Sequence, residues 1–136
     1  MRILASALAT LALTGGAFAA AHSAPMIEAS DQSVADGTVS ASAITANENG
    51  WLVVHRTDAD MKPGPVVGHA PIRSGETQDV AAILTEEVAS GDMLMLMVHS
   101  EAGGNETGVF EYTLGAEEDG PIRVDDQLVM TVITAQ

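Results

Sequence analysis

The amino-acid sequence predicts an all-β fold, an antiparallel β-sandwich of about seven or eight strands behind an N-terminal signal peptide. Short runs rich in Val, Ile, Leu, Met and Thr alternate with turn residues from Met26 onward. The turn signals recur at the spacing typical of antiparallel strands, which is closer than the spacing of alternating βαβ units. No segment shows a sustained helical period with capping residues.

The N-terminus has the three parts of a secretory signal peptide. Arg2 supplies the positive charge, residues 3–13 are apolar, and Ala17-Phe18-Ala19 offers small residues to a peptidase. The apolar run is shorter than the roughly 20 residues that a membrane helix needs. We therefore expect a periplasmic or secreted protein, with a signal peptide at residues 1–21 and one domain at 26–136. Three cleavage points are plausible, after Ala19, Ala20 or Ala21.

Composition excludes several function classes. The chain has no cysteine, which rules out thiolate metal sites and cysteine nucleophiles. Nineteen acidic residues oppose five basic ones, giving a formal net charge of −14. Such a surface repels phosphate, so we expect no nucleic-acid partner, and nothing after the signal peptide resembles a membrane span.

Turn chemistry separates the strands expected in the first half of the domain. An aspartate or asparagine beside glycine, or proline beside glycine, favours a turn over a continuing strand. In chain order, the expected strands and turns are 26–29, Asp36-Gly37, 38–46, Glu48-Asn49-Gly50, 51–56, Pro63-Gly64-Pro65, 66–72 and Ser74-Gly75.

The second half continues the pattern, with one segment where a helix competes. In "DVAAILTEEVASG", Val80, Ile83, Leu84 and Val88 could share a helical face, but we favour a strand that ends at Leu84. The remaining strands and turns are 78–84, Ser90-Gly91, 93–100, Gly103-Gly104-Asn105, 108–114, Asp119-Gly120-Pro121 and 128–134.

Side-chain alternation assigns faces to these strands. Trp51, Val53 and His55 share one face of theirs, and we expect Trp51 to be the largest contributor to the core. Residues 93–100 are apolar on both faces, which predicts a central strand covered on both sides. One of these faces carries Met93, Met95, Met97 and His99.

Four motifs occur together in order: "GWLVVH", "PGPVVGHAPI", "LMLMVHSEAG" and "GVFEY". With them the chain resembles a domain of unknown function found in exported proteins of halophilic archaea and some bacteria, over about residues 27–134. The resemblance implies an immunoglobulin-like β-sandwich, exported or attached to a cell surface, and it implies no chemistry. This chain differs from the family pattern at Glu101, where Asp is commoner, and in a longer loop at Asn105.

Three strand histidines, His55, His69 and His99, are the candidate metal ligands. If their strands are neighbours, the imidazoles could converge with Glu101 or Glu111 nearby, and neutral imidazole suits zinc or copper. His22 joins them only if cleavage makes it the mature N-terminus. We favour a structural role over metal binding for these histidines, because strand-end histidines more often bond to the backbone or to acidic neighbours.

The methionine row that leads to His99 has two readings of its own. Thioethers prefer Cu(I), but methionines on one strand face also fill cores.

The leading functional hypothesis is a non-enzymatic binding or interaction module whose partner is an unknown protein, surface or metal ion. The alternative is a periplasmic copper- or zinc-binding protein that uses the strand-end histidines. The sequence contains no nucleophile elbow, no zinc-protease motif and no phosphate-binding glycine loop, so we predict no catalytic residue and, in the leading hypothesis, no cofactor.

Overall fold

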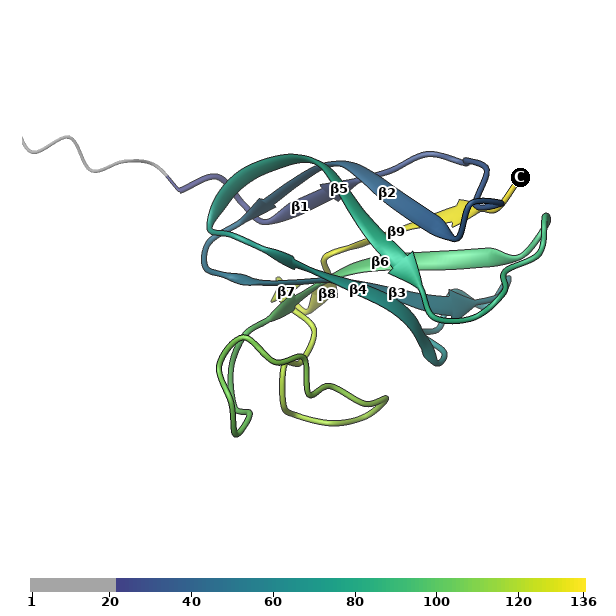
Figure 1. Ribbon diagram of the computed structural model, residues 1–136. Helices are drawn as coiled ribbons and strands as arrows, with labels where there is room; N and C mark the ends of the chain where they lie inside the picture. The colour runs from purple at the N-terminus through teal and green to yellow at the C-terminus, as the bar shows by residue number, and fades with distance from the viewer. Residues whose placement is uncertain (1–21) are drawn as a thin grey trace, which may run out of the picture.

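The computed structural model describes residues 22–136, and the signal peptide expected at residues 1–21 lies outside them. The described chain is all β and contains no helix (Figure 1). In this part of the chain there is accordingly no helix able to cross a membrane. Its strands are β1 (Met26–Glu28), β2 (Thr38–Ala46), β3 (Gly50–Thr57), β4 (Val66–Ile72), β5 (Gly75–Leu84), β6 (Met93–Ser100), β7 (Arg123–Val124), β8 (Gln127–Leu128) and β9 (Met130–Thr134).

Seven strands form one antiparallel sheet in the order β1-β2-β5-β4-β3-β6-β9, and β7 and β8 form a separate small hairpin. The sheet curls until it is nearly barrel-like, because β1 contacts β6 and β9 at the far end of the order. The link between β4 and β5 is short, with only two paired positions, whereas β4 pairs with β3 at six. The prediction of an all-β antiparallel fold is confirmed. The finer prediction of an immunoglobulin-like sandwich is not, because the ladder is a single sheet.

Most strand positions follow from the sequence pattern. Strands β2, β4 and β6 have the expected bounds, and β5 ends at Leu84 as predicted. The strand expected at 128–134 is split between β8 and β9, with Val129 outside both. The backbone amide of Val129 donates to Ile122 at 3.1 Å, while its carbonyl accepts the amide of Val98 on β6 at 3.0 Å.

The strand predicted at 108–114 is wrong, because this segment belongs to an irregular loop. Two of its backbone amides bond to carboxylates of the loop, and that of Val109 bonds to the carbonyl of Glu106. The amide of Gly108 donates to Glu101 Oε1 at 3.0 Å, and the amide of Glu111 donates to Asp119 Oδ2 at 2.8 Å. Acidic side chains therefore replace a sheet partner here.

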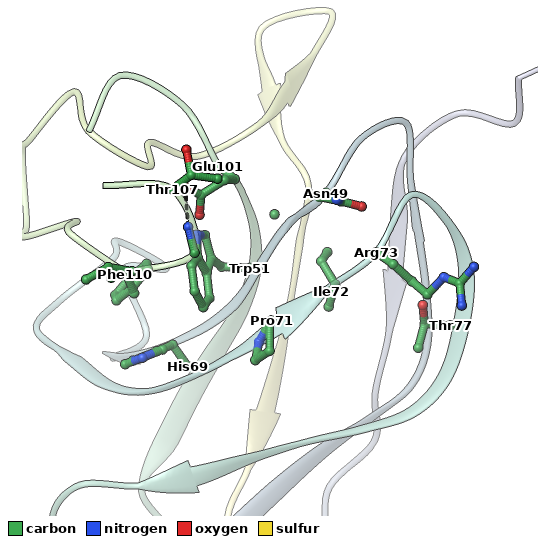
Figure 2. Close-up of a pocket in the computed structure, with 13 residues that line it drawn as sticks. Asn49, Trp51, His69, Pro71, Ile72, Arg73, Thr77, Glu101, Thr107 and Phe110 are labelled. Atoms are coloured by element: carbon green, nitrogen blue, oxygen red, sulfur yellow. Dashed lines mark hydrogen bonds between the residues drawn. The ribbon is translucent and has the colours of Figure 1, made fainter. Parts of the chain in front are cut away.

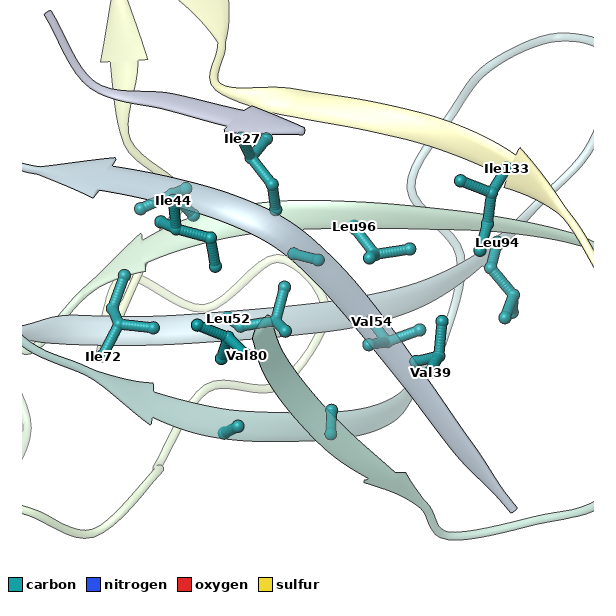
Figure 3. Close-up of a cluster of buried hydrophobic side chains, with 14 of the residues drawn as sticks. Ile27, Val39, Ile44, Leu52, Val54, Ile72, Val80, Leu94, Leu96 and Ile133 are labelled. Atoms are coloured by element: carbon teal, nitrogen blue, oxygen red, sulfur yellow. The ribbon is translucent and has the colours of Figure 1, made fainter. Parts of the chain in front are cut away.

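The main hydrophobic core fills the inside of the curl (Figure 3). Leu52 and Val54 of β3 and Leu94 and Leu96 of β6 are fully buried there. Each such side chain stabilises the fold by about 1.5–3 kcal/mol. Trp51 is also buried, but it lies outside this cluster, so the expectation that it is the main contributor to the core is wrong. Alternation turns Trp51 to the other face of β3.

That other face of β3 and β6 is covered by residues 101–122, which we call the covering loop. In Figure 1 the loop, coloured green to yellow-green, lies on the side of β3, β4 and β6 opposite β1, β2 and β5. Beneath it, Val53, His55, Met95, Met97 and His99 are fully buried. Both faces of β6 are therefore covered, as the sequence predicts.

Candidate functional site

The pairing of β3 with β6 brings His55 and His99 together, although 44 positions separate them in sequence. Trp51 is opposite His99, Val53 opposite Met97, and His55 opposite Met95. The two histidines are thus on the same face and on adjacent strands, with the Val53–Met97 pair between them. Their Nε2 atoms are 3.4 Å apart, and both side chains are fully buried.

The other ring nitrogen of each histidine is held by a backbone carbonyl. His55 Nδ1 is 2.8 Å from the oxygen of Gly64, and His99 Nδ1 is 2.6 Å from the oxygen of Asp119. A carbonyl can only accept, so each Nδ1 must carry a proton and donate it. When both rings are neutral, each Nε2 therefore has a lone pair, and the two lone pairs face each other.

Burial determines the charge of the pair. It lowers the pKa of His99 to about 4, against a smaller opposing effect of the hydrogen bond to Asp119, and a charge on His55 would lower it further. Burial also lowers the pKa of His55, opposed by its bond to Gly64. Both imidazoles are accordingly neutral at pH 7, which is the form that binds metals.

The two histidines make three polar contacts: one with Gly64, one with Asp119 and one between their Nε2 atoms. Each contact is favourable only if a proton or a cation lies between the two atoms. Two neutral imidazoles carry two protons, and both are used by the carbonyls of Gly64 and Asp119. The contact between the Nε2 atoms is then left without a bridging group. It becomes favourable only when one positive charge, a proton or a metal ion, lies between the rings.

Tyr112 covers the pair from the covering loop. Its ring meets the His99 ring edge-on, with centroids 4.5 Å apart, and the His55 ring at 5.9 Å. Its hydroxyl oxygen accepts a bond from the Gly115 amide at 3.4 Å. An apolar ring face and edge, and not water, therefore borders the histidines on this side.

The carboxylates expected near the histidines stabilise the loop instead. Glu111 accepts bonds from the amides of Asn105 and Glu106, and Glu101 accepts one from Gly108. Asp119 is 1% exposed, and its two carboxylate oxygens accept the amides of Ala102 and Glu111. Within residues 22–136, no group of three or more His, Asp or Glu side chains is arranged to hold a metal ion.

His69 does not join the pair. It lies opposite Val53 on β4, is exposed, and stacks on Phe110 with ring centroids 4.3 Å apart. Phe110 in turn lies edge-on to the His99 ring with centroids 6.4 Å apart. His22 is exposed and borders a shallow hollow with Thr45 and Glu76, at the ends of β2 and β5.

A groove of about 790 Å³ lies beside the histidines, between the start of β3, the β4–β5 turn and the covering loop. Figure 2 shows Trp51, His69 and Phe110 along one part of it and Arg73 and Thr77 along another. The Trp51 Nε1 and Thr77 Oγ1 atoms are buried without a hydrogen-bond partner in the described chain. This groove was not predicted, since it is made by segments distant in sequence.

Sequence reasoning also missed Gly64, Asp119 and Tyr112, the residues that orient and cover the pair. The Pro63-Gly64-Pro65 turn is visible in the sequence, but no local signal shows that its carbonyl meets His55. The contacts of Asp119 and Tyr112 depend on the path of an irregular loop, which periodicity does not reveal.

Comparison with known proteins gives a family and no activity. No curated protein and no solved structure matches this chain. Residues 25–136 match the model of a domain of unknown function, DUF7282, which covers nearly all of the described structure, and the chain belongs to this family.

Proposed function

We propose that this protein is an exported, non-enzymatic binding module whose ligand is a transition-metal ion held between His55 and His99. The observation that carries the proposal is the 3.4 Å separation of the two buried Nε2 atoms. The Nδ1 atom of each ring donates a hydrogen bond to a backbone carbonyl, so each Nε2 has a free lone pair.

The separation suits two ligands of one ion. Bonds of about 2.0–2.1 Å at a tetrahedral angle place two imidazole nitrogens roughly 3.3–3.4 Å apart. Metal-binding histidines also typically donate the other ring N–H to a carbonyl or carboxylate, which fixes the tautomer. Gly64 and Asp119 supply such carbonyls. We therefore propose the zinc or copper site with His55 and His99 as ligands and without His69.

Export and an immunoglobulin-like relationship form part of the same proposal. The signal-peptide pattern of residues 1–21 supports export. The order β1-β2-β5-β4-β3-β6-β9 equals A-B-E-D-C-F-G when the strands are lettered along the chain. This is the strand order of an immunoglobulin sandwich whose two sheets, A-B-E-D and C-F-G, are joined through β4 and β3, which pair at six positions.

Metal stoichiometry tests the proposal. The mature chain is stripped with a chelator, dialysed separately against Zn(II) and against Cu(I) under reducing, anaerobic conditions, and analysed by mass spectrometry of the bound metal. We expect one ion per chain for the wild type and for His69→Ala, and loss of binding for His55→Ala and His99→Ala. Circular dichroism checks that each variant is folded.

Two results would contradict the proposal. The first is a wild-type protein that retains neither ion. The second is a folded His55→Ala/His99→Ala double variant that binds as much metal as the wild type, because the ion would then lie elsewhere. If the double variant does not fold, His55→Gln and His99→Gln provide the same comparison with a smaller change in volume.

A further inference from the structure

We infer that the ion is monovalent copper and that the thioether of Met97 is its third ligand. The inference rests on the proposed function, since it specifies the ion and the remaining ligand at the His55–His99 pair.

The charge of the site favours a monovalent ion. One positive charge satisfies the contact between the two Nε2 atoms, and both imidazoles stay neutral. The cost of burying an ion rises with the square of its charge, so a divalent ion costs about four times as much to transfer. Charged ligands could offset that cost, but residues 22–136 bring no carboxylate together with the two histidines as a metal-holding group, and the oxygens of Asp119 accept the amides of Ala102 and Glu111. The carboxylates of Glu101 and Glu111 are likewise engaged by loop amides.

The ligands near the pair are soft. Met97 is fully buried, and its pair with Val53 is the one between His55 and His99 on the same face of the sheet. Of these two side chains, only methionine has an atom that can bind a metal. A thioether selects Cu(I) over zinc, calcium or magnesium. Imidazole binds copper as well as zinc, so the two histidines are compatible with this choice.

The number of ligands also favours copper. Structural zinc sites usually have four protein ligands from Cys, His, Asp and Glu. Residues 22–136 bring only two such side chains together here, and Tyr112 closes the side facing the covering loop. Three ligands at about 120° with bonds of ~2.0 Å place the two nitrogens about 3.5 Å apart, so the observed 3.4 Å suits a trigonal site as well as a tetrahedral one. A trigonal site of two imidazoles and one thioether therefore fits the geometry.

X-ray absorption at the copper edge, with binding competition, tests the inference. The mature protein is loaded anaerobically with Cu(I), and affinity is measured against a Cu(I) chelator for wild type, Met97→Leu and Met93→Leu. Met93 is the matched control because it lies on the same face of β6 but pairs with Thr57, beyond His55. We expect two nitrogen and one sulfur scatterers in the wild type and in Met93→Leu. In Met97→Leu the sulfur should be lost, with affinity lower by about tenfold or more.

The outcomes separate this inference from the proposed function. If Zn(II) binds as tightly as Cu(I), or if the sulfur scatterer persists in Met97→Leu, the inference is wrong. The proposed function still holds in that case, provided that His55→Ala and His99→Ala lose the ion. If the wild type binds no ion, both are wrong. Wild-type preference for Cu(I) of about 100-fold or more over Zn(II), with sulfur lost only in Met97→Leu, supports both.

Discussion

Asp119 holds His99 with its backbone and the covering loop with its side chain. Its carbonyl accepts the His99 Nδ1 proton at 2.6 Å, and its carboxylate accepts the amides of Ala102 at 3.1 Å and Glu111 at 2.8 Å. The backbone of Asp119 has a positive φ of 46°, which aspartate tolerates better than most residues. One buried residue therefore couples the path of the loop to the orientation of the histidine.

Replacing Asp119 with alanine should destabilise the protein and weaken the proposed metal site together. Two backbone amides in part-buried hydrogen bonds lose their acceptor, and a donor left unpaired costs about 1–3 kcal/mol when fully buried and less where water reaches it. We expect a loss of roughly 2–4 kcal/mol in the free energy of unfolding, measured by urea denaturation of the metal-free protein. Asp119→Asn keeps one acceptor oxygen and should lose less.

Glu117→Ala is the control for this prediction, because Glu117 is an exposed carboxylate of the same loop. Its removal should change stability by less than about 0.5 kcal/mol. Equal stability of Asp119→Ala and Glu117→Ala would show that the carboxylate of Asp119 does not hold the loop.

The metal-free protein should lose stability as the pH falls from about 6.5 to about 4. Burial lowers the pKa of His99 to about 4, below its ordinary value of 6.5, so in this window the unfolded chain binds a proton that the folded chain does not. Acid therefore favours unfolding, and the contribution of His99 to stability is fully present only above pH 6.5. The expected loss from His99 is about 2–3 kcal/mol at pH 4.5, and the lowered pKa of His55 adds to it in the same direction.

Urea denaturation at several pH values, in the presence of a chelator, measures this dependence. His99→Leu removes the titrating group, so its stability should vary less between pH 4.5 and 7. Asp92 and Glu111, whose pKa values are lowered by hydrogen bonds, act below this window and are shared by both proteins. A wild type and a His99→Leu variant with parallel pH profiles would contradict the prediction.

Most of the fold was predictable because antiparallel strands carry a local signal. Alternation and turn residues place β2, β4 and β6 at the expected positions and assign His55 and His99 to their faces. The covering loop was not predictable for the opposite reason. Phe110 and Tyr112 alternate like strand residues, but side-chain acceptors elsewhere in the loop bond to its amides, and these acceptors leave no periodic pattern.

The candidate site was predictable only in part, because convergence depends on strand register. The sequence singled out His55 and His99 as candidate ligands, and it placed His69 on an equal footing with them. Pairing of β4 with β3 does place His69 on the same face, opposite Val53. Phe110, from a loop whose path the sequence does not reveal, stacks on His69, whereas Tyr112 of the same loop packs on His55 and His99.

Truncating a residue inside the curl should cost more in the free energy of unfolding than truncating an exposed strand residue. Leu52→Ala removes a fully buried side chain inside the curl and should cost about 2–5 kcal/mol. Ile83→Ala removes a side chain that is 75% exposed and should cost less than about 1 kcal/mol. Thermal and urea unfolding compare the two, and equal losses would contradict the assignment of Leu52 to the core.

Gly50 sets how closely β3 approaches β6 at the His99 end of the site. A Cβ atom at this position would overlap the backbone carbonyl oxygen of His99, and backbone atoms cannot move aside as a flexible side chain can. Gly50→Ala should therefore push the strands apart, cost about 1–3 kcal/mol in stability, and lower metal affinity by displacing His99 from His55. Urea denaturation and Cu(I) competition measure the two effects on the same samples. Glu48→Ala, an exposed change in the adjacent turn, should alter neither, and a Gly50→Ala variant that binds and unfolds like Glu48→Ala would show that this close approach does not position the histidine.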